Sequence, residues 1–335
     1  MSNRKGPPHA QVIDLVSGKL ISKAISLAAD LALADQLIGG ARSVRELAEK
    51  LEVNEDALYR LMRTLESVGI FEETGEGEFE NSELSEVLRS DHPQSVRAYA
   101  RWYGTDLHWD VWKNLDYSLR TGRPSLTREH PDSGPFEVLA QHPRAHQIFI
   151  EAMTGFTLSE AMNIVQSYDF SGYGSMMDVG GAHGALALAI HKEYPDLELS
   201  VFDLPHVLEG AAELKKSSLQ AVAGSFFDPI PGAVDACILK HIIHDWGDED
   251  SATILRHCRA ALNPGGEILV CEMLIHSGPG HHVAKTLDLE MLAGPGGRER
   301  AEEQFAELFE KAGLRLDRVV RTPSPLAIIV GRPQE

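Results

Sequence analysis

The stretch Asp178–Gly184 reads Asp-Val-Gly-Gly-Ala-His-Gly, and its first two residues complete the apolar, strand-sized run Ser175–Val179. Glycine has no Cβ, so the backbone can turn sharply here and approach a ligand closely. In open α/β sheets, ligands bind at the carboxyl ends of the strands. The sequence therefore predicts a strand that ends in a glycine turn at a binding edge.

Segments typical of strands and helices alternate on the C-terminal side of this turn. Alternation of this kind predicts an α/β fold with a mostly parallel, doubly wound, Rossmann-like sheet. The expected strands are Ser175–Val179, Leu197–Phe202, Asp235–Lys240, Glu267–Met273, Leu316–Arg321 and Leu326–Val330, and the expected helices are Gly184–Tyr194, Val207–Lys216, Asp248–Leu262 and Ala301–Lys311. Gly313 follows the last helix, as a glycine at the C′ position often does.

An acidic residue, Asp203, stands at the end of the second expected strand. A carboxylate there can accept hydrogen bonds from two ribose hydroxyls. It could also simply stabilise the N-terminus of the helix that follows. Together with the glycine turn, Asp203 favours an adenosine ligand, while NAD and S-adenosylmethionine remain open at this point.

The N-terminal third has a different pattern, which is typical of a winged helix. Residues 11–38 predict a pair of apolar helices, and Ser43 with Glu46 has the spacing of a capping box. A helix over Glu55–Val68 and a hairpin over Gly69–Phe79 should follow.

Charge opposes a DNA-binding role for this module. The whole chain has a formal net charge of -19, and residues 41–89 carry six cationic and thirteen acidic side chains. The helix that would enter a DNA groove starts with Glu55 and Asp56, which phosphates would repel. We therefore expect contacts with protein, and binding neither to nucleic acid nor to an anionic membrane.

The composition, with 43% hydrophobic and 24% charged residues, is that of a globular protein. No apolar run approaches the roughly 20 residues that span a bilayer. The N-terminus lacks the apolar core of a secretory signal. Three cysteines, none in a Cys-x-x-Cys pair, form no disulfide framework: Cys237, Cys258 and Cys271. Cytoplasmic localisation is the expectation.

Several ordered motifs resemble one family, the caffeic-acid-type S-adenosylmethionine-dependent O-methyltransferases of plants and their bacterial relatives in natural-product pathways. The motifs are Asp178–Gly184, Phe202–Val207, Gly224–Phe227, Leu239–Trp246, Asn263–Gly266 and Gly296–Arg300. The resemblance implies a homodimer with a winged-helix dimerisation domain over residues 1–95, a helical connector contributing to the acceptor pocket over 96–165, and a methyltransferase domain over 166–335. It also implies S-adenosylmethionine as cofactor and S-adenosylhomocysteine as its product.

By the same resemblance, the cofactor contacts fall on matching motif positions. They are Asp178, Gly180, Gly181, Asp203, Leu204, Ser225, Phe226 and Lys240. The chain departs from the family pattern in two places, with Ala182 where the loop has glycine and Ser225 where an aspartate accepts from adenine. A hydroxyl can also accept, without charge, so we expect the cofactor to bind with a weaker adenine contact.

Methyl transfer to a phenol benefits from a general base, because a phenol of pKa ~10 is a poor nucleophile near neutrality. His244 lies just after an expected strand and matches the catalytic base of the family, and Glu272 and Glu299 match the two acids that orient it. Glu272 lies in an apolar strand, where an unpaired charge is costly. His241 and His244 could instead share a metal, but the pattern lacks the other ligands of a zinc site, so no metal is expected.

Resemblance places the acceptor pocket at Met153, Phe149, Trp109 and Met291, although apolar side chains at helical spacing are more often core. His241 replaces an aromatic residue of the family and indicates a more polar or differently shaped acceptor. We expect an O-methyltransferase acting on a small hydroxylated aromatic molecule. The alternatives are a member with hydroxylase-like or no catalytic activity, and a winged-helix regulator that senses an adenosyl ligand.

Overall fold

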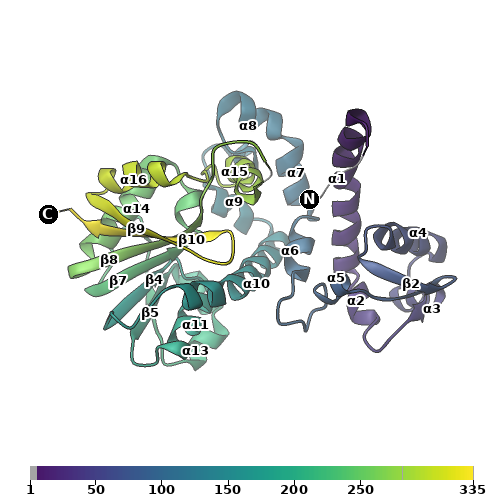
Figure 1. Ribbon diagram of the computed structural model, residues 1–335, viewed down its shortest axis with the longest axis horizontal. Coiled ribbons are helices and arrows are strands. Elements are labelled where there is room, and N and C mark those ends of the chain that lie inside the picture. The colour runs from purple at the N-terminus through teal and green to yellow at the C-terminus, as the bar shows by residue number, and fades with distance from the viewer. Residues whose placement is uncertain (1–5, 281, 335) are drawn as a thin grey trace. The chain divides into compact units, whose positions relative to one another are not determined.

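The computed structural model describes residues 6–280 and 282–334. The chain forms two compact units (Figure 1). The first comprises the chain up to Lys113 together with Leu139–Phe156, and the second comprises Asn114–Val138 together with the chain from Thr157 onward. The segment 96–165, expected to be a separate connector, is thus divided between the units. Within the described ranges no helix is long and apolar enough to cross a membrane.

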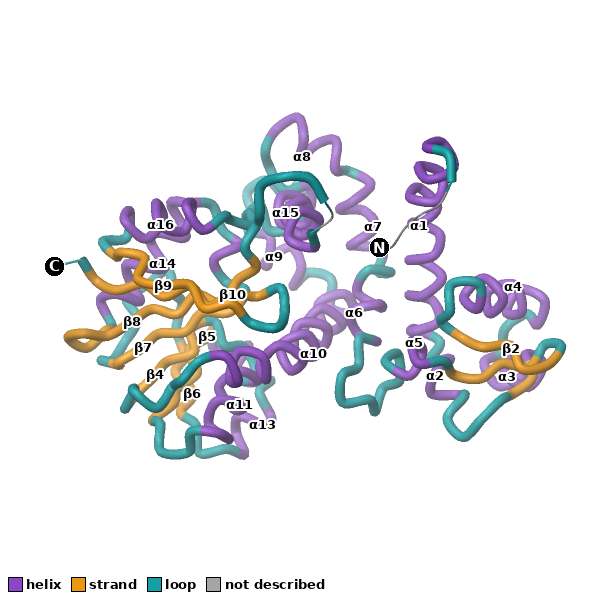
Figure 2. The backbone as a smooth tube through the Cα atoms, viewed as in Figure 1, coloured by secondary structure: helices purple, strands orange, loops and turns teal. Residues whose placement is uncertain are grey.

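The second unit is built on a seven-stranded sheet with the order β6-β5-β4-β7-β8-β10-β9. The strands are β4 (Ser175–Val179), β5 (Glu198–Asp203), β6 (Gln220–Ala223), β7 (Val234–Lys240), β8 (Leu262–Met273), β9 (Leu314–Arg321) and β10 (Leu326–Pro333). The five from β6 to β8 pair in parallel, and β10 runs antiparallel to both of its neighbours. The expected mostly parallel, doubly wound fold is confirmed. Figure 2 shows the strands of this sheet with helices on either side.

Helices cover both faces of this sheet, with α14 and α16 on one face and α11 and α13 on the other (Figure 1). The helices are α11 (Ala185–Glu193), α12 (Pro205–Glu209), α13 (Ala212–Lys216), α14 (Asp248–Ala260), α15 (Val283–Ala293) and α16 (Glu302–Lys311). Apolar strand residues such as Val270 and Ile329 pack against Leu255 and Phe309 of the covering helices to form the core. This core holds the strand ends, and therefore the binding edge, in place.

The structure corrects several expected boundaries in this unit. The single helix predicted over Val207–Lys216 is two short helices, α12 and α13, separated at Gly210 and Ala211. Strand β6 was not predicted, because its four residues alternate too briefly to give a periodic signal. Gly313 follows α16 with a φ of 73°, the left-handed conformation expected at a C′ glycine.

The first unit contains the elements expected of a winged helix. They are α1 (Pro8–Asp30), α2 (Leu33–Gln36), β1 (Arg42–Ser43), α3 (Val44–Leu51), α4 (Glu55–Glu66), β2 (Phe71–Gly75), β3 (Glu78–Asn81), α5 (Glu83–Glu86), α6 (Arg97–Trp102) and α7 (Asp106–Lys113). The three strands form an antiparallel sheet. The capping box is confirmed, since the backbone N–H of Glu46 donates to the Ser43 hydroxyl and that of Ser43 donates to the Glu46 carboxylate.

Residues 11–38 form one long helix and one short turn of helix rather than two comparable helices. Leu33, Leu37, Leu47 and Met62 lie fully in the core of this unit. The remaining helical segments are α8 (Leu115–Thr121), η1 (Ser125–Thr127), α9 (Pro135–Ala140), α10 (Pro143–Ser167) and η2 (Ile243–Asp245). Helix α10 begins in the first unit and ends in the second.

Candidate active site

The glycine turn after β4 has a geometry that requires glycine. Gly180 has a φ of 73°, and a Cβ there would lie 2.4 Å from Cδ1 of Ile242. A Cβ on Gly181 would lie 2.7 Å from the carboxyl group of Asp178. Ala182, which replaces a glycine of the family pattern, adopts a left-handed φ of 48°, a conformation that costs an L-residue roughly 1–2 kcal/mol. Ala182 thus adopts here a conformation that glycine would take at lower cost.

Asp203 ends β5 directly beside this turn. Its Oδ2 accepts from the backbone N–H of Ala182 at 2.8 Å, and its Oδ1 accepts from that of Leu204 at 2.7 Å. Burial raises the pKa of Asp203, and these two N–H groups oppose the rise. The carboxylate is therefore fixed in orientation, and each oxygen retains a lone pair for a ribose hydroxyl.

Asp178 is a buried acid at the same edge. Its Oδ2 has no hydrogen-bond partner among the described residues, and burial, followed by the charge of Asp203, raises its pKa to about 7. A cationic group bound near the turn would relieve this cost. The α-ammonium and sulfonium of S-adenosylmethionine are such groups, so the residues present fit that cofactor.

An aromatic cluster adjoins the turn. Phe226, Phe227 and Trp246 meet edge to face, with ring centroids 4.7–5.9 Å apart. The hydroxyl of Ser225 accepts from the backbone N–H of Phe227. The ammonium of Lys240 lies 2.8 Å from Glu160 and 3.2 Å from the hydroxyl of Thr157. Its contact with the cofactor stays a prediction.

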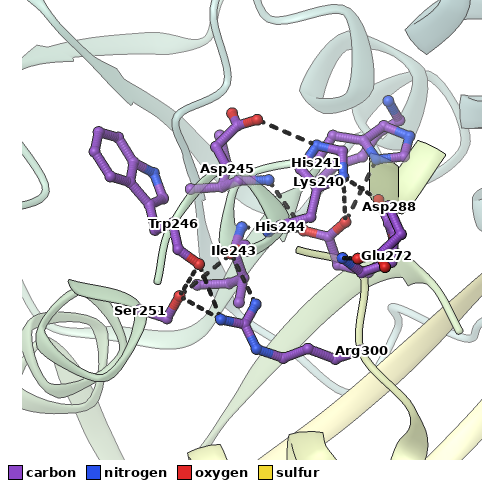
Figure 3. Close-up of polar contacts among 12 residues, drawn as sticks. Lys240, His241, Ile243, His244, Asp245, Trp246, Ser251, Glu272, Asp288 and Arg300 are labelled. Carbon is purple, nitrogen blue, oxygen red and sulfur yellow. Dashed lines mark hydrogen bonds and ion pairs between the residues drawn. The ribbon is translucent and has the colours of Figure 1, made fainter. Parts of the chain in front are cut away.

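His244 lies in η2, just beyond β7, and Glu272 lies beside it (Figure 3). Glu299 also reaches its ring. Its Nδ1 is 2.7 Å from Oε1 of Glu299 and 3.5 Å from Oε2 of Glu272. Oε1 of Glu272 also accepts from the backbone N–H groups of Ile242, Ile243 and His244 at 3.0–3.3 Å. Glu299 therefore orients the ring, while Glu272 holds the backbone that carries it.

These carboxylates control the charge of His244. Burial alone would lower the pKa of His244, but Glu272, Asp245 and Glu299 outweigh burial and raise that pKa to about 10. Burial would raise the pKa of Glu272, but the charge of His244 and the contacts of His241 lower it to about 2. The carboxyl of Asp245 lies 3.6 Å from Nε2 of His244, and burial raises the pKa of Asp245 to about 6. His244 is thus a much stronger base than an ordinary histidine.

Arg300 was not predicted to have a role, although it ends the quoted motif Gly296–Arg300. Its side chain is 1% exposed and donates to the carbonyl oxygens of Ile243 at 3.0 Å and Trp246 at 2.9 Å. Figure 3 shows the guanidinium directed at these two carbonyls, which lie on either side of His244 in the chain. Because Arg300 directly follows Glu299 in the sequence, it connects the segment of Glu299 with that of His244. The signal available in the sequence was its place directly after Glu299 in the quoted motif.

A second histidine and a further acid also lie here. His241 is 3.1 Å from Glu160 and 3.4 Å from Glu272, and Glu160 was missed because nothing in its helix distinguishes it from a surface acid. His241, His244 and Glu272 offer ligand atoms within 4.8 Å of one another, a spacing that would suit a metal. A metal on Nδ1 of His244 would displace the bond to Glu299. The expectation of no metal stays a prediction.

The expected acceptor residues fall in different units. Phe149 and Met153 lie on the part of α10 in the first unit, as does Trp109 on α7, whereas Met291 is buried in α15 of the second. Phe149 packs edge-on against Trp102, and Lys19 lies over the Trp109 ring. Neither unit by itself brings the four together, so their role as a pocket stays a prediction.

Comparison with known proteins decides the family. Residues 112–315 match the model of the O-methyltransferase domain, and residues 13–91 match that of the O-methyltransferase dimerisation domain. The chain belongs to the O-methyltransferase family. This O-methyltransferase is 34% identical to the phenazine O-methyltransferase PhzM of Lysobacter antibioticus, over 99% of both chains.

Solved structures agree with this assignment. The structure of LaPhzM superposes with a TM-score of 0.93 at 33% identity, covering 98% of this O-methyltransferase and 100% of that chain. NcsB1 from neocarzinostatin biosynthesis, solved with S-adenosylmethionine and 2-hydroxy-5-methyl naphthoic acid, superposes with a TM-score of 0.79 at 30% identity, covering 94% and 96%. The expected family, fold class and enzyme class are confirmed.

Proposed function

We propose that this enzyme transfers the methyl group of S-adenosylmethionine to a hydroxyl of a small aromatic molecule, with His244 as general base. The observation that carries the proposal is the imidazole held by Glu299 and Glu272 at the same sheet edge as the glycine turn and Asp203. S-adenosylmethionine is the methyl donor, and supplies an electrophilic methyl group on a sulfonium. His244 would take up the acceptor proton as the acceptor oxygen receives the methyl group, and S-adenosylhomocysteine would be left as the product.

The residues of this chain divide the remaining work. Asp203 would hold the ribose, Gly180 and Gly181 would let the backbone approach the cofactor, and the buried carboxyl of Asp178 would face its cationic portion. Leu204, Ser225 and Phe226 would contact the adenine and ribose of the cofactor. Positioning of the two reactants supplies much of the rate in a transfer of this kind.

The raised pKa of His244 suits a phenolic acceptor. A phenol has a pKa of about 10, which matches the pKa of about 10 for His244. Proton transfer between groups of equal pKa has little thermodynamic cost, and the phenolate that results is the stronger nucleophile. Glu272 and Glu299 then stabilise the imidazolium that forms.

The acceptor class follows from the relatives. PhzM is named for a phenazine, and NcsB1 was solved with a naphthoic acid. We infer a fused-ring or single-ring hydroxylated aromatic acceptor, with His241 favouring a polar one. Incubation with methyl-labelled S-adenosylmethionine and a panel of phenols, naphthols and hydroxyphenazines should give a labelled methyl ether, unaffected by a chelator. Cofactor binding without transfer to any of them would favour the alternative, a member with repurposed or no chemistry.

We also propose that the enzyme acts as a homodimer assembled through the first unit. Helix α1 exposes six large apolar side chains: Val12, Ile13, Leu15, Val16, Leu20 and Leu27. A groove of about 830 Å³ in the same unit is lined by further apolar residues, among them Ile21, Ile25 and Leu84. Apolar surface of this extent marks an interface, and the dimerisation-domain match covers all of these residues except Val12.

Removal of residues 1–38 is expected to abolish the dimer and to cause aggregation, because the apolar groove loses one wall and its partner. Val16→Asp, at a position 71% exposed, should give a folded monomer by sedimentation. Leu119→Asp, at a position 68% exposed in the second unit, is the matched control and should remain dimeric. A dimeric Val16→Asp together with a soluble, active truncated monomer would contradict this interface.

A further inference from the structure

His241 links two buried carboxylates in the second unit. Its Nε2 is 3.1 Å from Oε2 of Glu160, on α10, and its Nδ1 is 3.4 Å from Oε2 of Glu272, on β8. The side chains of Glu160 and Glu272 are 6% and 0% exposed. Lys240 shares the same Glu160 oxygen at 2.8 Å. Two charged acids therefore face the two ring nitrogens of one histidine.

The backbone holds His241 in this position at a cost. His241 has a φ of 54°, a left-handed conformation that is uncommon for residues other than glycine, although histidine, asparagine and aspartate adopt it more often than most. Its backbone N–H donates to the carbonyl of Cys271 on β8. Its ring stacks on the His244 ring, with centroids 4.8 Å apart and planes inclined by 23°. Strain at a functional position persists where the surrounding contacts determine the conformation.

We propose that His241 is a positioning residue which, placed between Glu160 and Glu272 and stacked on His244, sets the pH at which His244 becomes a free base. The inference rests on the proposed role of His244 and adds a second histidine that does not touch the reacting atoms. Contacts from His241 offset the charge of Glu272, so that less of this charge acts on His244. Glu160 acts in the opposite direction, because its charge holds His241 and Lys240 away from Glu272.

The sign of each effect follows from the groups that surround the two rings. Those groups are Glu160 on α10, Lys240 on β7, Asp245 in η2, Glu272 on β8 and Glu299 before α16. Loss of His241 leaves the full charge of Glu272 acting on His244, which stabilises the imidazolium. Loss of the Glu160 charge removes one anion and releases two donors toward Glu272, which destabilises the imidazolium.

The test compares the pH dependence of kcat/KM for wild type, His241→Phe and Glu160→Gln, from about pH 6 to about pH 10.5, with a phenol of pKa near 10. His241→Phe should move the rising limb about one pH unit upward, so that kcat/KM near neutrality falls about tenfold. Glu160→Gln should move it downward. His241→Gln, which keeps a donor but cannot carry charge, should fall between wild type and His241→Phe. Histidine Cε1–H resonances should show the same shifts, with the His244 signal identified by its loss in His244→Ala.

Glu151→Gln is the matched control, since it neutralises an acid on the same helix roughly 13 Å further along; its profile should not move. Shifts of opposite sign for His241→Phe and Glu160→Gln support the proposal. The proposal for His241 would be overturned if both variants kept the wild-type midpoint of the kcat/KM profile and only lowered its plateau, or if both shifted the midpoint in the same direction. His244 would remain the proposed base in either case. Undiminished turnover in His244→Ala would instead show that His244 is not the base, which would contradict the proposed function. If His241→Phe does not fold, His241→Gln and Glu160→Gln decide the question.

Discussion

Replacing His244 by alanine is expected to lower turnover by about 10²–10⁴ with a phenol of pKa near 10. The acceptor would then have to lose its proton to water before attack, because the imidazole proposed to take up that proton is missing. Binding of S-adenosylhomocysteine, measured by calorimetry, should change little, since Asp203 and the glycine turn are on other strands. The loss should shrink for acceptors of low pKa, which are already ionised at the assay pH.

The pH dependence separates this role from a structural one. Because the pKa of His244 is raised to about 10, the imidazolium predominates below that pH. The fraction of free base then grows tenfold for each pH unit. Wild-type kcat/KM with a phenol of pKa near 10 should therefore keep rising through the neutral range instead of levelling near pH 7. Glu272→Gln should cause a smaller loss than His244→Ala, because the imidazole remains in place. Near-normal turnover by His244→Ala on the same phenol would show that proximity alone drives transfer.

Asp203→Ala is expected to weaken S-adenosylhomocysteine binding by about 10- to 100-fold, which corresponds to about 1.4–2.8 kcal/mol. The substitution removes the acceptor for two ribose hydroxyls and leaves the N–H groups of Ala182 and Leu204 without their partner. Ala182 would lose a contact that holds its left-handed conformation.

The matched control for Asp203→Ala is Glu198→Ala, which removes an exposed carboxylate from the other end of the same strand. Affinity for S-adenosylhomocysteine should be unchanged in that variant. Equal affinities for wild type and Asp203→Ala by calorimetry would exclude Asp203 as the ribose acceptor. An Asp203→Asn variant should retain part of the affinity, because an amide oxygen still accepts a hydrogen bond.

The order of strands and helices in the second unit could be predicted because it depends on local signals. Apolar runs of strand length, the glycine turn and the acid after the second strand all lie within a few residues of one another. Once parallel pairing was expected, the carboxyl ends of β4, β5 and β7 had to share one edge, which brings Asp178, Asp203 and His244 to it. The sequence by itself thus determined the sheet and the edge that carries the chemistry.

The tertiary structure alone decided how that edge works. Glu160 and His241 are 81 residues apart in the chain, and Arg300 reaches the carbonyl of Ile243 across 57. Such contacts leave no periodic pattern in the sequence, because they depend on how separate elements pack. The pKa of His244 likewise depends on tertiary contacts. An isolated imidazole has a pKa near 6.5. The rise to about 10 arises from the neighbouring Asp245 together with Glu272 and Glu299, two carboxylates that only the folded chain brings within reach of the ring.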